Sequence, residues 1–389
     1  MFADTHTKKM NPRYFLFIIL FFVFSIFQVS CFTIKNPATF SAQKLKEAVI
    51  KKNVTGKIDI NAKYLPGNKI EISWKTDLPD RIRKISIYRS STNLGDITLD
   101  KITYPITIFD INPDPDINSF TDNRTAHNTK YFYMLSVQTE SGRIYHSSVV
   151  SCKTANKSIP PLKSPHILID KVNYFLEIVD VGKEIKRYPM ALGRNPLKRK
   201  LNQDNQTTPE GIFRITNLQS NVPQFYKAYD LNYPTDIDKF RYRFALANGI
   251  IKKRNGVHPG IGGEIQIHSG PNIEFNWTFG CATIRKADID ELFSIRKIGS
   301  GTKVIIVGRN IDREDLKVIY KKRSNKEIKE VQKKLKKAGF DPGVIDGVPG
   351  NRTRDALGRF QLKMNLPLTC QLDSRTAKEI EKIQISDTQ

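Results

Sequence analysis

Cys281 and His268 are the residues of this 389-residue chain whose side chains and spacing best suit nucleophilic chemistry. A thiol needs a base to become a useful nucleophile near neutral pH, and a nearby imidazole both accepts its proton and stabilises the thiolate. The thirteen positions from His268 to Cys281 allow a loop that returns the cysteine to the histidine. Gly280 permits a tight turn whose backbone N–H groups are expected to hold an oxyanion. A buried or disulfide-bonded cysteine is the alternative from these residues alone, and His258 is a weaker candidate base.

Both residues lie in a β-rich region, residues 165–309, which begins with HILIDKVNYFLEIVD and closes with GTKVIIVG. His268 stands at the end of a strand-like run, and residues 287–293 are expected to form a helix after the cysteine. A proline-containing linker at 155–164 precedes the region, and a second linker at 310–324 follows it. The pattern predicts a separate domain that carries the chemistry.

Residues 60–154 show the two-residue period of β-strands. Ile70, Ile72 and Trp74 alternate with polar residues, and similar short runs follow, each bounded by Gly, Pro, Asn or Asp. The pattern predicts a β-sandwich, and it resembles a fibronectin type III or immunoglobulin-like domain with Tyr131 or Tyr133 as the candidate tyrosine corner. We expect this domain to be a spacer or an interaction module.

The chain opens with a basic stretch and a fourteen-residue apolar run, YFLFIILFFVFSIF, which is the layout of a secretory signal over residues 1–31. The run ends at QVSC, which resembles the lipobox of bacterial lipoproteins, where the cysteine, here Cys31, is acylated after cleavage. Lipidation at Cys31, simple cleavage and an uncleaved N-terminal anchor are all open, and each predicts export. The polar, Lys-rich residues 32–59 are interpreted as a spacer.

Lys and Arg total 63 against 39 Asp and Glu, which gives a net charge of +24 and a pI near 9.7. So positive a chain implies an anionic partner such as nucleic acid, acidic lipid or bacterial cell wall, and export argues against nucleic acid. With 39% hydrophobic residues the chain buries ordinary cores and is not a polytopic membrane protein. Four cysteines without metal-ligand spacing predict neither a disulfide scaffold nor a metal site.

Three amphipathic helical faces occupy residues 325–384, and Ser324 with Glu327 forms a capping box before the first of them. The Gly-rich stretch between the first two faces and the pair Phe360-Gln361 resemble the bacterial peptidoglycan-binding domain of the three-helix type. This resemblance implies a small three-helix bundle with peptidoglycan as its partner. Within the Gly-rich stretch, Asp346 is expected to bond loop amides.

The segment around Cys281 resembles the signature of the L,D-transpeptidase catalytic domain, the YkuD-like fold. Residues 276–281, NWTFGC, are similar to the subgroup with Asp-Trp-Thr-x-Gly-Cys, and IDKVNYFLEIVDVGKEIKRYPMALG, TTPEGIFRI and LNYPTDID agree with the family elsewhere. The resemblance implies a mainly-β domain in which the Cys281 thiolate attacks a peptidoglycan stem peptide and forms a thioester. His268 would act as the base, and no metal or cofactor is required.

The resemblance also implies roles for neighbouring residues. Backbone amides at Gly280 and Cys281 would hold the oxyanion, Thr278 would orient the loop, and the candidate substrate-binding residues are Trp277, Ser269 and Arg285. The family usually has glycine where Ser269 stands, and its commonest members carry arginine at position 283, which is threonine here. For the displaced Arg285, a helix or surface salt link is favoured over substrate binding.

These features predict an exported, membrane-anchored L,D-transpeptidase of the bacterial cell envelope, located in the periplasm. It would form wall cross-links or attach proteins, such as a lipoprotein, to the wall. The subgroup also contains hydrolases, so an L,D-carboxypeptidase or an amidase that releases a wall-linked lipoprotein is the first alternative. A non-catalytic wall-binding protein is the second.

Overall fold

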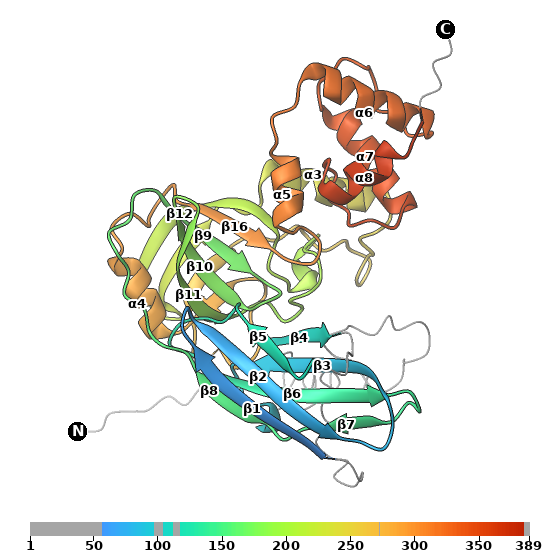
Figure 1. The fold of residues 1–389 in the computed structure, drawn as a ribbon. Helices are drawn as coiled ribbons and strands as arrows, with labels where there is room; N and C mark the ends of the chain where they lie inside the picture. Colours follow the sequence, from blue (N-terminus) through green and yellow to red (C-terminus); the bar gives the residue numbers. More distant parts are fainter. Residues whose placement is uncertain (1–56, 97–103, 112–116, 272, 385–389) are drawn as a thin grey trace, which may run out of the picture.

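The computed structural model describes residues 57–96, 104–111, 117–271 and 273–384 (Figure 1). The described part is mainly β, and it contains six α-helices. The predicted signal at 1–31, with Cys31, and most of the predicted spacer lie outside these ranges. Within them, none of the helices combines the length and the apolar character needed to cross a membrane.

The first part of the chain forms two antiparallel sheets that share one apolar core, in which Ile70, Ile72 and Trp74 are buried as predicted. One sheet contains β1 (Lys57–Leu65), β2 (Lys69–Asp77) and β5 (Ser119–Asp122), and the other contains β3 (Ile82–Ser90), β4 (Ile106–Ile111), β6 (Lys130–Thr139), β7 (Ile144–His146) and β8 (Val150–Lys153). β1 begins inside the predicted spacer because Ile58, buried and paired with Thr76, continues the alternation. The fibronectin-like assignment stays a prediction.

Two tyrosines of β6 make the bonds that are relevant to a tyrosine corner. The Tyr131 hydroxyl accepts a hydrogen bond from the Ala126 backbone N–H at 2.9 Å, five residues upstream. The Tyr133 hydroxyl instead donates to the carboxylate of Asp122 at 2.9 Å. Because a tyrosine corner bonds backbone a few residues upstream, Tyr131 fits that role better than Tyr133.

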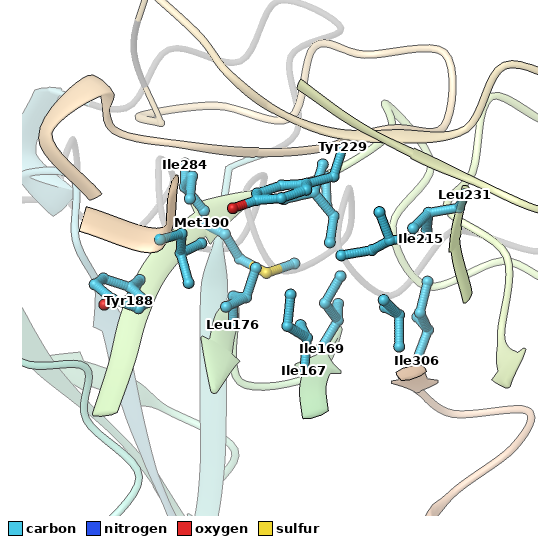
Figure 2. Close-up of a cluster of buried hydrophobic side chains, with 14 of the residues drawn as sticks. Ile167, Ile169, Leu176, Tyr188, Met190, Ile215, Tyr229, Leu231, Ile284 and Ile306 are labelled. Carbon is cyan, nitrogen blue, oxygen red and sulfur yellow. The ribbon is translucent and has the colours of Figure 1, made fainter. Parts of the chain in front are cut away.

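The middle of the chain closes into an eight-stranded barrel in the order β10-β11-β15-β14-β13-β12-β16-β9. The strands are β9 (Pro165–Asp170), β10 (Phe175–Asp180), β11 (Lys183–Ala191), β12 (Gly211–Val222), β13 (Tyr226–Leu231), β14 (Gln266–Ser269), β15 (Ala282–Ile284) and β16 (Lys303–Val307). Only the β14/β15 and β16/β9 pairs of this barrel are parallel. Figure 2 shows the apolar side chains, among them Ile169, Met190 and Tyr229, that fill the space between the strands.

Two helices lie between strands of the barrel in the chain. The second packs into the barrel core, whereas the first shares an apolar cluster with Leu368 and Cys370 near the C-terminus. α3 (Asp236–Ala247) follows β13 and begins with a capping box between Thr235 and Asp238. α4 (Lys286–Ser294) follows β15, where a helix was predicted, and its Ile289 and Leu292 are buried in the barrel core. α4 therefore anchors the segment that contains Cys281.

A buried guanidinium joins the sandwich to the barrel. Arg89 of β3 donates through Nη1 to both carboxylate oxygens of Asp122, at 3.0 and 2.8 Å, and through Nη2 to the Asn173 carbonyl of the barrel at 3.0 Å. The aspartate holds the pKa of Arg89 above its ordinary value against the opposing effect of burial. The sandwich is thus docked on the barrel, and the predicted linker at 155–164 is not the only connection between them.

The residues predicted as a linker at 310–324 contain a helix, α5 (Arg313–Ile319), so this expectation was incomplete. A capping box of Asp312 and Asp315 starts α5, and Leu316 is buried. The Asp315 carboxylate also accepts a hydrogen bond from the Ser374 backbone N–H at 3.2 Å. Capping and tertiary contacts therefore order a segment whose composition resembles a linker.

The last three helices, α6 (Asn325–Lys337), α7 (Asn351–Lys363) and α8 (Ser374–Glu381), share one apolar core that includes Leu335, Phe360 and Ile380. The predicted capping box of Ser324 and Glu327 is confirmed. Asp346 accepts the Val348 backbone N–H at 2.8 Å, which is the loop-bonding role expected of it. Assignment of the segment to the three-helix type of bundle stays a prediction.

Candidate active site

The parallel pairing of β14 with β15 brings the two predicted catalytic residues near one another, with His268 on β14 and Cys281 directly before β15. Within this pair His268 lies opposite Thr283, and Ile267 lies opposite Ala282. Cys281 immediately precedes β15, so it lies beside the start of β14, before His268 in that strand. The cysteine is one of three described cysteines that are free of disulfides, the others being Cys152 and Cys370.

The His268 ring is buried and has a defined tautomer. Its Nδ1 lies 2.8 Å from the Ser269 carbonyl oxygen, which can only accept, so Nδ1 carries the proton and Nε2 keeps a lone pair. Phe225 packs against the ring at 4.1 Å between centroids, and Trp277 meets it edge-on at 5.7 Å. Burial lowers the pKa of His268 below its ordinary value, which the Ser269 carbonyl partly offsets. The neutral imidazole is therefore ready to accept a proton near pH 7.

The Cys281 thiol rests in its protonated form. Burial raises its pKa to about 11, opposed by a backbone hydrogen bond at Gln266 and by the charge of Lys200. The thiol donates to the Glu264 carbonyl oxygen at 3.5 Å. Because so little thiolate exists at neutral pH, attack by this sulfur requires a base to remove its proton in the reacting complex.

Thr278 holds the loop that leads to the cysteine. Its hydroxyl accepts the Gly280 backbone N–H at 3.2 Å and donates to the Cys281 carbonyl at 2.7 Å. Gly280 has φ +141°, and a Cβ there would lie 2.9 Å from the Thr207 carbonyl oxygen. Because Thr278 occupies the Gly280 N–H, that amide is not free for an oxyanion, and the predicted role is left to the amide of Cys281.

The candidate substrate-binding residues have different environments. Ser269 is buried, with 4% of its surface exposed, and its hydroxyl donates to the Phe225 carbonyl, so this donor is used within the protein and the substrate-binding role of Ser269 stays a prediction. Trp277 is half-buried beside His268, and its indole N–H has no hydrogen-bond acceptor among the described residues. The Trp277 indole nitrogen is itself enclosed by protein atoms, so the substrate-binding role of this residue stays a prediction.

Arg285 forms the salt link that the sequence favoured for it. Its Nε and Nη2 donate to the Asp288 carboxylate at 2.6 and 2.9 Å. Its Nη1 donates to the Asn128 carbonyl of the sandwich at 2.9 Å. Three of its donors are thus used within the protein, at the N-terminus of α4.

Lys200 is a charged neighbour of the cysteine that the sequence did not single out. It is 5% exposed, while Lys198, two residues away in the same basic run, is exposed. Nothing in the composition of that run distinguishes the two lysines, so only the fold reveals the difference. His258, the weaker candidate base, is exposed on the segment between α3 and β14, whereas His268 is buried at the site.

A cavity of about 660 Å³ lies elsewhere, between α3 and the C-terminal helices. Phe240, Arg243 and Phe244 of α3 line one side, and residues that include Phe340 and Arg352 line the other. Cys281 and His268 are not among its lining residues. The cavity therefore belongs to the junction between the barrel and the last helices rather than to the cysteine site.

Comparison with known families gives two matches. Residues 164–306 match the L,D-transpeptidase catalytic domain, YkuD, and residues 324–380 match a peptidoglycan binding domain, PG_binding_1. The barrel is a YkuD-family L,D-transpeptidase catalytic domain. The matched range of this L,D-transpeptidase domain contains Cys281 and His268, and the peptidoglycan-binding domain contains α6 and α7. No curated protein matches the chain.

Among solved structures, an L,D-transpeptidase from Xylanimonas cellulosilytica is 14% identical with a TM-score of 0.26, over 39% of this chain and 64% of that one. This chain therefore spans less than two thirds of that relative. Mycobacterium tuberculosis L,D-transpeptidase 1 is 11% identical with a TM-score of 0.23, over 47% of this chain and 73% of that one. The FN5 domain of Drosophila Lar is 25% identical with a TM-score of 0.20, over 26% of this chain and 95% of that one.

Proposed function

We propose that the protein is an exported cysteine L,D-transpeptidase that acts on the stem peptides of peptidoglycan. The L,D-transpeptidase domain and the peptidoglycan-binding domain in one chain support a wall-modifying activity. The observation that carries the cysteine mechanism is the 2.8 Å contact between His268 Nδ1 and the Ser269 carbonyl oxygen, from which the tautomer follows. With Nδ1 bonded to Ser269, its Nε2 lone pair is available on the strand beside Cys281.

In the first step, Nε2 of His268 accepts the Cys281 thiol proton, and the thiolate attacks the carbonyl of the diamino acid at position three of a tetrapeptide stem. The C–S bond forms and the C–N bond to the terminal D-Ala breaks. The imidazolium returns the proton to the leaving amine. The Cys281 backbone amide stabilises the oxyanion, and Thr278 keeps the loop that presents that amide in place.

In the second step, an amine attacks the thioester carbonyl, loses its proton to His268 and releases the Cys281 thiolate. A neighbouring stem or an attached protein, such as a lipoprotein, supplies the amine. Water in place of the amine turns the same site into an L,D-carboxypeptidase, and an amide to a wall-linked lipoprotein as the donor turns it into a releasing amidase. The buried residues of the site serve all of these acyl-transfer reactions equally.

The rest of the chain holds this site at the wall. The peptidoglycan-binding domain supports peptidoglycan as the partner, and the net charge of +24 favours a carboxylate-rich polymer. We propose that the N-terminal signal exports the chain to the periplasm, where an anchor or a lipid on Cys31 tethers it. The sandwich at 60–154, fibronectin-like in its pattern, would be the spacer between the tether and the catalytic domain.

The experiment incubates the purified protein with tetrapeptide muropeptides, with and without an acceptor amine. Loss of D-Ala with products larger than the donor indicates transfer, whereas shortened donors alone indicate hydrolysis. Cys281→Ala should abolish both reactions, and Cys152→Ala, which removes a free cysteine of the sandwich, should leave them unchanged. Unchanged muropeptides with the wild-type protein would support the non-catalytic wall-binding alternative.

A further inference from the structure

Lys200 is buried beside the loop that carries the nucleophile. It follows β11 and precedes a short 3₁₀ turn, η2 (Gln203–Asn205), and 5% of its surface is exposed. Its Nζ lies 3.4 Å from the position that a Cβ on Gly280 would occupy, next to Cys281 in the chain. The ammonium also lies 5.7 Å from the centroid of the Tyr233 ring.

The Lys200 ammonium lacks the partners that a buried charge usually has. Among the described residues, no carboxylate lies within salt-bridge distance of it, and no acceptor takes a hydrogen bond from it. The buried Lys171 shows the contrast, since its ammonium bonds Glu210 at 2.9 Å and the Thr208 carbonyl at 2.7 Å. The Lys200 side chain is largely buried, but its nitrogen is not among the fully enclosed atoms without a partner, so the ammonium keeps contact with solvent while no anion of the described residues neutralises it. Such a charge is available to an anion that forms beside it.

The anion that can appear next to this ammonium is the sulfur of Cys281. Charged groups at the thiol have opposing effects: Lys200 favours the thiolate, and Glu264 and Asp230 disfavour it. Facing Lys200 are Cys281, Lys171 and, more weakly, Asp238. Lys171 is already neutralised by Glu210, which leaves Lys200 as the positive charge available to the sulfur.

We propose that the Lys200 ammonium is the electrostatic partner of the Cys281 thiolate, stabilising it once His268 has removed the thiol proton. The proposal rests on the proposed cysteine mechanism. Lys200 therefore acts on the reactivity of the sulfur, and it takes no proton in the cycle. Burial lowers the pKa of Lys200 to about 8, so the ammonium form is present near neutral pH and the support weakens above about pH 8.

The test measures the rate at which iodoacetamide alkylates Cys281 as a function of pH, followed by mass spectrometry of the peptide that contains it. Removing a positive charge this close raises a thiol pKa by about one unit or more. In Lys200→Met we therefore expect alkylation to be roughly tenfold slower at pH 7, where the wild-type lysine is charged, and to approach the wild-type rate above about pH 8, where that lysine is neutral. Lys200→Arg keeps the charge and should stay close to the wild type.

Lys198→Met is the matched control, because that lysine is exposed two residues away, and its profile should equal the wild-type profile. Loss of an unpaired buried charge should leave the thermal midpoint of Lys200→Met unchanged or higher, so slower alkylation with intact folding separates electrostatics from structure. If the Met variant does not fold, Lys200→Gln replaces it. Equal alkylation rates at pH 7 for the wild type and a folded uncharged variant would overturn the proposal. Alkylation needs no peptidoglycan, so its result is independent of whether muropeptides are converted.

Discussion

His268 of β14 pairs with Thr283 of β15 in a parallel ladder. The strand pairs on either side of it in the barrel, β13 with β14 and β11 with β15, are antiparallel. Parallel neighbours need a connection of about a dozen residues, and residues 270–281 supply it. The connection ends at Cys281, directly before β15, with α4 following that strand. The sheet register, rather than a flexible loop alone, therefore determines where the nucleophile stands relative to its base.

Gly280→Ala should damage the loop in two ways. The residue has φ +141°, and the new Cβ would lie 2.9 Å from the Thr207 carbonyl oxygen and 3.0 Å from Ile265. We expect a loss of about 1–3 kcal/mol in stability and a larger fractional loss in kcat than in KM, because Cys281 is displaced. Thermal unfolding and steady-state kinetics on a muropeptide donor measure both.

Gly142→Ala is the control for that substitution. This glycine also has positive φ, at +83°, but its Cβ would have nothing within 4 Å. It should therefore show the backbone cost without the clash and without any effect on kinetics. Equal kinetic parameters for Gly280→Ala and the wild type would show that the loop tolerates the side chain and that its geometry is not critical.

The fall of kcat/KM at acid pH should follow protonation of the His268 imidazole. Burial lowers the pKa of this imidazole below 6.5, and only the neutral ring can accept the thiol proton. We expect kcat/KM to fall as the pH drops through a midpoint below 6.5, because protonation then removes the base. His268→Gln should be nearly inactive over the whole range. An acid limb with a midpoint clearly above 6.5 would contradict the assignment.

Asp122→Asn should destabilise the sandwich strongly. The substitution leaves the Arg89 guanidinium buried without its carboxylate, and breaking a buried pair costs about 3–5 kcal/mol. Lys84→Met is the matched control, because its pair with Asp110 is roughly half exposed, and such pairs contribute about 1 kcal/mol or less. Chemical denaturation of the two variants compares them. Similar losses for both would mean that Arg89 finds a substitute partner.

The features that local sequence determines were the ones predicted correctly. Alternation along β2, the capping box at Ser324 and the helix after Cys281 each depend on residues a few positions apart. The nucleophile and the base were predicted by a sequence pattern, and the structure places His268 on β14 and Cys281 directly before the neighbouring β15. Their catalytic roles stay predictions.

Features that depend on distant residues were missed. α5 is ordered by its capping box and by its bonds to α8, which a short polar segment does not reveal. The Ser269 hydroxyl donates to the Phe225 carbonyl, 44 positions away, and this hydrogen bond had no local signal in the sequence. Lys200 and Lys198 look alike in the sequence, and only closure of the barrel buries one of them. Burial and long-range pairing, rather than residue type, decide these cases.

The most direct test of the cysteine mechanism is the mass of the intact protein after a brief reaction with a tetrapeptide muropeptide, quenched in acid. We predict an adduct equal to the donor minus D-Ala, located on Cys281, absent from Cys281→Ala and removed when an acceptor amine is added. Conversion of the donor by the Cys281→Ala protein, or an adduct on any other residue, would contradict the account.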